Sequence, residues 1–168
     1  MLNILENFKI DGRFISYEPY GEGHINDTYL VTYDNNNQKE QYILQKINHN
    51  IFKDIEGLMN NINYVTSHLK SKMQSKDSRE VLTVIQTKDN KNYYFNGKDY
   101  YRVYIFIQNS LTLQQASTPE LFKESAIAFG RFQNYLTDFD ATLLVETIKN
   151  FHNSEARFNH FIETLKKV

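Results

Sequence analysis

Three strand-like runs follow one another within the first 47 residues, and their short connections strongly restrict the fold. The runs cover residues 14–20, 27–33 and 41–47 and are rich in aromatic and β-branched side chains, which favour a pleated, half-buried surface. A glycine-containing turn over residues 21–26 and an Asp-Asn-Asn-Asn turn over residues 34–37 separate them. Connections this short join adjacent antiparallel strands, so the sequence predicts an antiparallel meander.

Helix and strand signals alternate along the rest of the chain. Asp54 is a suitable N-cap, and the apolar residues behind it recur at helical spacing; they are Leu58, Ile62, Val65 and Leu69. The polar residues 70–79 are expected to form a surface loop. Residues 80–87 and a hairpin with Asn96-Gly97 at its turn add further strands. We therefore predict an α+β fold with a five-stranded antiparallel sheet and one inserted helix.

Two more helices are predicted in the last third of the chain. Thr118 followed by Pro119 is a typical helix start, and Ser154 is expected to open the final helix. The apolar face of the first would carry Phe122, Ala126, Phe129, Phe132 and Leu136, and that of the second Phe158, Phe161, Ile162 and Leu165.

Composition excludes several classes of function. The formal net charge is −1, so no basic field favours binding to nucleic acid or to an anionic membrane. Cysteine is absent, which excludes disulfides and thiolate metal sites and fits a reducing compartment. The N-terminus has no apolar run of signal-peptide length, and no segment has the roughly 20 apolar residues of a membrane span. We expect a cytoplasmic protein.

The glycine turn and a lysine in the third strand are the candidate functional groups. Backbone N–H groups near Gly21 and Gly23 can approach phosphate oxygens because no Cβ intervenes. Lys46 lies in an otherwise apolar run, where a buried ammonium is costly without a partner. Strand alternation puts Lys46 on one face with Tyr42 and Leu44, opposite Gln45. An outward-facing lysine remains the alternative interpretation.

Four segments together resemble a known family. They are GEGHINDTYLV, YILQKINHNIFKDIEGLMNNI, YYRVYIFI and AFGRFQNYL…LLVETIKNFHNSEARF, in the same order and spacing from about residue 14 to residue 165. Together they resemble the N-terminal half of the N-acetylhexosamine 1-kinases, within the aminoglycoside phosphotransferase and choline kinase superfamily. The resemblance implies ATP-dependent, magnesium-assisted phosphoryl transfer to the anomeric hydroxyl of an N-acetylhexosamine.

The resemblance also implies a kinase-like domain division and a nucleotide site. Residues 1–108 would form the N-lobe that covers the nucleotide, and residues 109–168 the hinge and the first helices of the larger lobe. Lys46 would hold the phosphates, and the end of the strand at Phe106 and Ile107 would flank the adenine. The remaining implied nucleotide-binding residues come from the glycine turn and the strand after it: Gly21, Gly23, His24, Ile25, Asn26 and Thr28.

The sequence departs from the family pattern at two points. The helix glutamate that would pair with the lysine is replaced by Asn60 and Asn61, with Asp54 and Glu56 as substitutes. No histidine is followed two residues later by aspartate, so the catalytic loop H-x-D-x-x-x-x-N is absent, and we assign no catalytic or metal residue. Asp138-Phe139-Asp140 imitates a metal motif but is interpreted as a solvated turn.

These departures predict the N-terminal fragment of a sugar 1-kinase, inactive alone. The alternative is a stand-alone nucleotide-binding or interaction module that uses an N-lobe fold without catalysis. On the fragment hypothesis the aromatic faces of the two late helices would be exposed, and self-association through them is expected.

Overall fold

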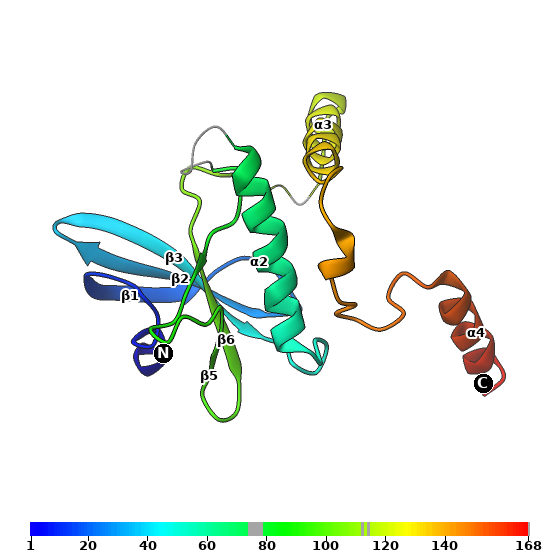
Figure 1. The fold of residues 1–168 in the computed structure, drawn as a ribbon, viewed down its shortest axis with the longest axis horizontal. Helices are drawn as coiled ribbons and strands as arrows, with labels where there is room; N and C mark the ends of the chain where they lie inside the picture. Colours follow the sequence, from blue (N-terminus) through cyan, green and yellow to red (C-terminus); the bar gives the residue numbers. More distant parts are fainter. Residues whose placement is uncertain (74–78, 112, 114, 168) are drawn as a thin grey trace.

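The computed structural model describes residues 1–73, 79–111, 113 and 115–167. Within them the fold is α+β, with one antiparallel sheet and four α-helices (Figure 1). The sheet has the order β1-β2-β3-β6-β4, and β5 pairs with β6 beside this path. The elements are α1 (Leu2–Leu5), β1 (Arg13–Pro19), β2 (Asp27–Asn35), β3 (Gln38–Ile47), α2 (Ile55–Lys72), β4 (Val84–Ile85), β5 (Tyr94–Phe95), β6 (Tyr100–Ile105), α3 (Pro119–Tyr135), the 3₁₀ helix η1 (Ala141–Leu143) and α4 (Ser154–Leu165).

The predicted meander is confirmed. β1, β2 and β3 pair antiparallel in sequence order. Asn36 and Asn37 both have positive φ, 53° and 63°, as a tight hairpin turn between right-twisted strands requires. This hairpin holds β2 and β3 in register over nine residue pairs, so it fixes which side chains share a face.

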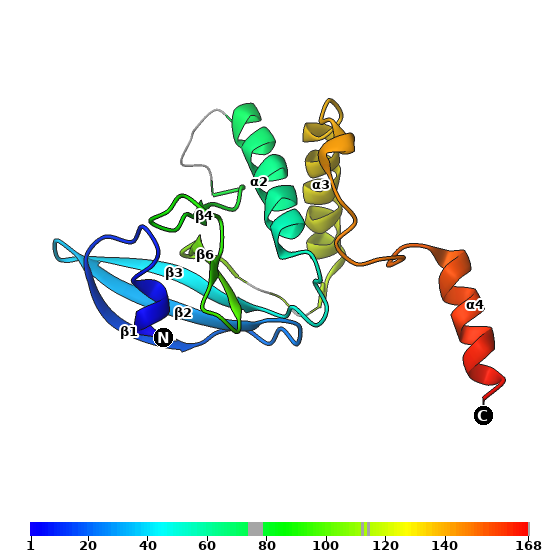
Figure 2. The ribbon, with the colours of Figure 1, turned by 60° about the horizontal axis from the view of Figure 1, so that its bottom comes forward.

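Each face of the sheet has its own apolar core. On one face α1 and the segment after it contribute Leu5 and Phe8, which pack with Val31, Leu44 and Val103. On the other face α2 packs over Ile47 with a second set of side chains: Ile55, Leu58 and Met59, flanked by Phe52, Ile62, Val84, Tyr93 and Tyr100. Figure 2 shows α2 above the sheet. The sheet is therefore covered on both sides.

Helix starts agree with the sequence. Asp54 accepts a hydrogen bond from the N–H of Gly57 at 2.8 Å, and Thr118 accepts one from the N–H of Leu121 with Pro119 as the first helical residue. The last helix does begin at Ser154, but Asn153 is its N-cap. These caps satisfy N–H groups that have no partner inside the helix.

The sheet has six strands rather than five, and the run at residues 80–87 is mostly irregular. Only Val84–Ile85 forms a strand there. Thr87 ends it, because its N–H donates to the carbonyl oxygen of Lys91 at 2.8 Å and its hydroxyl to Asp89 at 2.6 Å. This turn returns the chain to the sheet as β5, which pairs antiparallel with β6 and confirms the hairpin predicted around Asn96-Gly97. The loop expected over residues 70–79 does not begin at residue 70, since α2 continues to Lys72; residues 74–78 lie outside the described part.

α3 and α4 are helical as predicted, and their aromatic faces are exposed. Phe122, Phe129 and Phe158 each keep more than 60% of their surface open to solvent. Both views place α3 beside α2 and α4 far from the sheet (Figures 1 and 2). None of the described helices is long and apolar enough to cross a membrane.

Tyr104 generates a prediction about alkaline stability. Burial raises its pKa from 10.0 to about 12, so the folded state holds this proton more tightly than the unfolded state does. The resulting stabilisation is complete below pH 10 and is lost as the pH rises toward 12. A pKa difference of about two corresponds to about 2–3 kcal/mol.

Urea unfolding at about pH 8 and about pH 12 measures this effect. Tyr104→Phe should lose about 1–2 kcal/mol less between the two pH values than the wild type. The exposed Tyr17 supplies the control, Tyr17→Phe, which should behave as wild type. Equal losses in all three proteins would contradict the assignment to Tyr104.

Candidate functional site

The glycine turn between β1 and β2 is open. Gly21 has φ +79°, a conformation that glycine adopts without strain. No atom outside the turn lies within 4 Å of where a Cβ would stand on Gly21 or Gly23. His24 and Ile25 are also exposed. The backbone of the turn is thus accessible to a ligand.

Asn26 fastens this turn to the sheet. Its Oδ1 accepts a hydrogen bond from the N–H of Asn48, just after β3, at 3.0 Å. At the base of the turn, the N–H of Tyr20 donates to the carbonyl oxygen of Thr28 at 2.9 Å. The side-chain oxygen of Asn26 is therefore used to hold the turn in place. Its side-chain amide nitrogen remains available to a ligand.

The segment after β6 lies close to the glycine turn. The ring of Phe106 meets the ring of Tyr20 edge-to-face, with centroids 5.5 Å apart. The N–H of Phe106 donates to the carbonyl oxygen of Gln41 at 3.0 Å, and both Phe106 and Ile107 are half-buried. The structure thus brings the predicted hinge residues next to the base of the turn.

Lys46 lies on the face of the sheet opposite α2. Its cross-strand partner on β6 is Tyr101, which belongs to the core under α1. Its Nζ lies 3.3 Å from Oδ1 of Asp99, and the hydrogen bond to that carboxylate is the largest cause of a raised Lys46 pKa. The partner of Lys46 is therefore Asp99, directly before β6, and not a residue of the helix.

A polar track that the sequence analysis did not identify crosses the face under α2. Thr28, Gln45 and Arg102 occupy paired positions on β2, β3 and β6. Nε2 of Gln45 donates to the hydroxyl of Thr28 at 3.0 Å, and Nε of Arg102 donates to Oε1 of Gln45 at 3.0 Å. Of these residues, only Thr28 is a predicted site residue. The sequence signal that could have identified the track is that Gln45 and Arg102 are polar residues within otherwise apolar stretches of β3 and β6.

Arg102 is a buried cation without a carboxylate partner among the described residues. Only 9% of its surface is exposed, and burial lowers its pKa. Its contacts are Gln45, the sulfur of Met59 at 3.8 Å and the face of the Tyr104 ring at 5.1 Å. A buried charge is normally paired, so this guanidinium is a strong attractor for an anion that reaches the face.

Asn61 attaches the segment after α3 to the outer side of α2. Its Nδ2 donates to the carbonyl oxygen of Val145 at 2.7 Å, and its Oδ1 accepts from the N–H of Val145 at 3.0 Å. The approach is close, since a Cβ on Gly57 would stand 2.5 Å from Cγ2 of Val145. The asparagine at the expected glutamate position therefore binds a backbone rather than a lysine. Asp54 caps α2 and is not a partner of Lys46 either.

Asp138 and Asp140 are exposed, as expected of a solvated turn, while Phe139 between them is half-buried. Asp138 forms an ion pair with Lys72 and lies 3.2 Å from Nε2 of His68, while the ring of Phe139 contacts His68. Asp140 accepts from the N–H of Thr142 at 3.0 Å and caps η1. Both acidic side chains thus have structural partners.

Within the part of the chain that the structure describes, no group of three or more histidine, cysteine, aspartate or glutamate side chains could hold a metal ion. A comparison of the chain with models of known protein families gives no match.

Asn61 yields a prediction about how firmly residues 139–145 are held. Asn61→Ala removes both hydrogen bonds to Val145, and each is worth about 0.5–1.5 kcal/mol. The amide proton of Val145 should then exchange about tenfold faster in a hydrogen-exchange measurement.

Asn60→Ala is the matched control, because Asn60 is exposed and the helix propensity changes in the same way. It should leave the exchange of Val145 unchanged. Equal acceleration in both variants would show that Asn61 does not hold this segment.

Proposed function

We propose that this chain forms the nucleotide-covering lobe of an ATP-dependent phosphotransferase, a sugar 1-kinase that acts on N-acetylhexosamines in the cytoplasm. The resemblance of residues 14–165 to that family supports the reaction class. An antiparallel sheet with a helix inserted after its third strand agrees with a kinase-like N-lobe. An open glycine turn, connected through Thr28 and Gln45 to the buried cation of Arg102, supports nucleotide phosphates as the ligand.

The uncompensated charge of Arg102 is the observation that carries this proposal. A buried guanidinium that has no carboxylate partner is already largely stripped of water. It therefore gains a favourable charge-assisted hydrogen bond when an anion binds to it. Gln45 links it to Thr28, directly after the glycine turn. In this proposal Arg102 and Gln45 bind phosphate oxygens under α2, while the turn amides cover them from the other side.

Lys46 has a different part in the proposal. Because Asp99 already neutralises it on the opposite face, Lys46 holds the start of β6 against the end of β3. Phe106 and Ile107, next to the base of the turn, would flank the adenine. The amide nitrogen of Asn26 and the ring of His24 remain available to phosphate or sugar.

The phosphoryl transfer step itself needs a general base and magnesium ligands, and we assign neither to residues of this chain. Phosphoryl transfer depends on a base and on magnesium to neutralise developing charge. None of the five histidines begins an H-x-D sequence. The 168-residue chain is therefore expected to bind nucleotide but to form no sugar 1-phosphate from MgATP and N-acetylhexosamine, and turnover by the purified chain would contradict this assignment.

A set of single substitutions tests which cation binds the phosphates. Arg102→Met should weaken ATP binding about 10- to 100-fold, as the loss of a charge-assisted hydrogen bond predicts. The fold should persist, because an apolar side chain of similar volume replaces a buried unpaired charge. Gln45→Leu should weaken binding less. Isothermal titration calorimetry measures the affinities, and circular dichroism checks the fold.

Lys46→Met and Lys39→Met remove the same charge from β3. Lys39 is exposed near the β2–β3 hairpin and serves as the control for net charge. Both variants should bind ATP within about threefold of wild type. A tenfold loss in Lys46→Met alone would assign the phosphates to Lys46, and absence of ATP binding by the wild type would favour an interaction module instead.

A further inference from the structure

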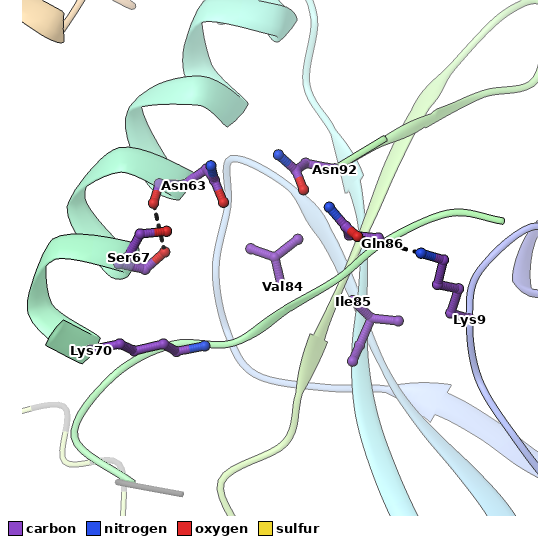
Figure 3. A pocket seen from close by; sticks show the side chains of 9 residues that line it. Lys9, Asn63, Ser67, Lys70, Val84, Ile85, Gln86 and Asn92 are labelled. Carbon is purple, nitrogen blue, oxygen red and sulfur yellow. Dashed lines mark hydrogen bonds between the residues drawn. The ribbon is translucent and has the colours of Figure 1, made fainter. Parts of the chain in front are cut away.

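A polar cavity of about 310 Å³ lies between α2, β4 and the segment after α1. α2 forms one wall, and Lys9 reaches in from the opposite side (Figure 3). The nine lining residues are Lys9, Asn63, Thr66, Ser67, Lys70, Val84, Ile85, Gln86 and Asn92. β4 and β1 are at opposite edges of the sheet path, so this cavity is separate from the glycine turn.

Among the described residues, two lysines and no carboxylate line the cavity. The ammonium of Lys70 has no hydrogen-bond acceptor and no acidic partner among the described residues, and burial lowers its pKa. Within the described part of the chain, the ammonium of Lys9 is bound only by the neutral side-chain oxygens of Gln86 and Asn90. The walls therefore carry two positive charges that no residue of the cavity neutralises.

Neutral donors surround these charges. The side chains of Asn63, Ser67 and Asn92 have no hydrogen-bond partner within residues 1–73, 79–111, 113 and 115–167 and remain available. Thr66, by contrast, donates its hydroxyl hydrogen to the carbonyl oxygen of Ile62 at 2.7 Å. Val84 and Ile85 are half-buried and provide the apolar surface between the two walls (Figure 3).

We propose that this cavity binds the phosphate group of a small phosphorylated compound. Two cations and three neutral side-chain donors match the three acceptor oxygens of a phosphate better than the two of a carboxylate. The volume is at the small end of ligand pockets, which span about 300–1,000 Å³, and the apolar surface suits the carbon part of a small ester. Binding would give Lys70 the counter-charge that it lacks.

Inorganic phosphate and glycerol 3-phosphate are the probes, titrated into the ¹⁵N-labelled chain at constant ionic strength. Saturable shifts of the side-chain amides of Asn63 and Asn92 are expected with both. Lys70→Met should weaken binding about tenfold. Since no contact in the described structure depends on its ammonium, this variant should stay folded, as the unchanged remainder of the spectrum would show.

Lys72→Met is the matched control, because Lys72 is on the same helix but pairs with Asp138; it should bind the probes as wild type does. Arg102→Met should also leave these shifts intact, which separates this site from the proposed nucleotide site. Tighter binding of glycerol 3-phosphate than of inorganic phosphate would support the phosphorylated compound as the ligand, and equal or tighter binding of inorganic phosphate would overturn it. Equal shifts with sodium chloride, no saturation, or wild-type affinity in Lys70→Met would each overturn the proposal.

Discussion

The alternation of side chains along β3 is the constraint on which the rest of the structure depends. Leu44 packs into the core under α1 and Ile47 into the core under α2, and both are completely buried. A shift of one residue would move each set to the wrong face. The same alternation sends Gln45 toward α2 and Lys46 away from it, so apolar packing decides which polar group of this strand is available on each face.

This packing leaves the positively charged side chains of the two faces with different partners. Lys46 is exposed enough to be satisfied by one carboxylate, Asp99. Arg102 is buried against Met59 and Tyr104, where desolvation is costly and where all its partners among the described residues are neutral. An apolar side chain at this position would cost the fold less than a buried, unpaired cation does. The presence of Arg102 is therefore better explained by a function than by a contribution to stability. Anion binding is the function that its chemistry supports.

Local signals in the sequence predicted most of the elements, because caps and turns act over a few residues. Asp54, Thr118 and the asparagines at residues 36 and 37 each fix a helix start or a hairpin by their own hydrogen bonding or backbone conformation. The pairings across the sheet were not predictable in this way. The Lys46–Asp99 ion pair joins residues 53 positions apart along the chain, as the numbering shows, and Asn61 binds a backbone 84 residues away. The strand alternation did place Lys46 and Gln45 on opposite faces, but it could not show which face α2 covers.

The central claim is that nucleotide phosphates bind on the face of the sheet under α2. It is tested most directly by mapping chemical-shift changes in the ¹⁵N-labelled chain on addition of ADP. The account predicts that the largest changes occur at the side-chain Nε–H of Arg102, the side-chain amide of Gln45 and the backbone of Thr28 and the glycine turn. Changes confined to Lys46, Asp99 and Tyr101, on the opposite face, would contradict it.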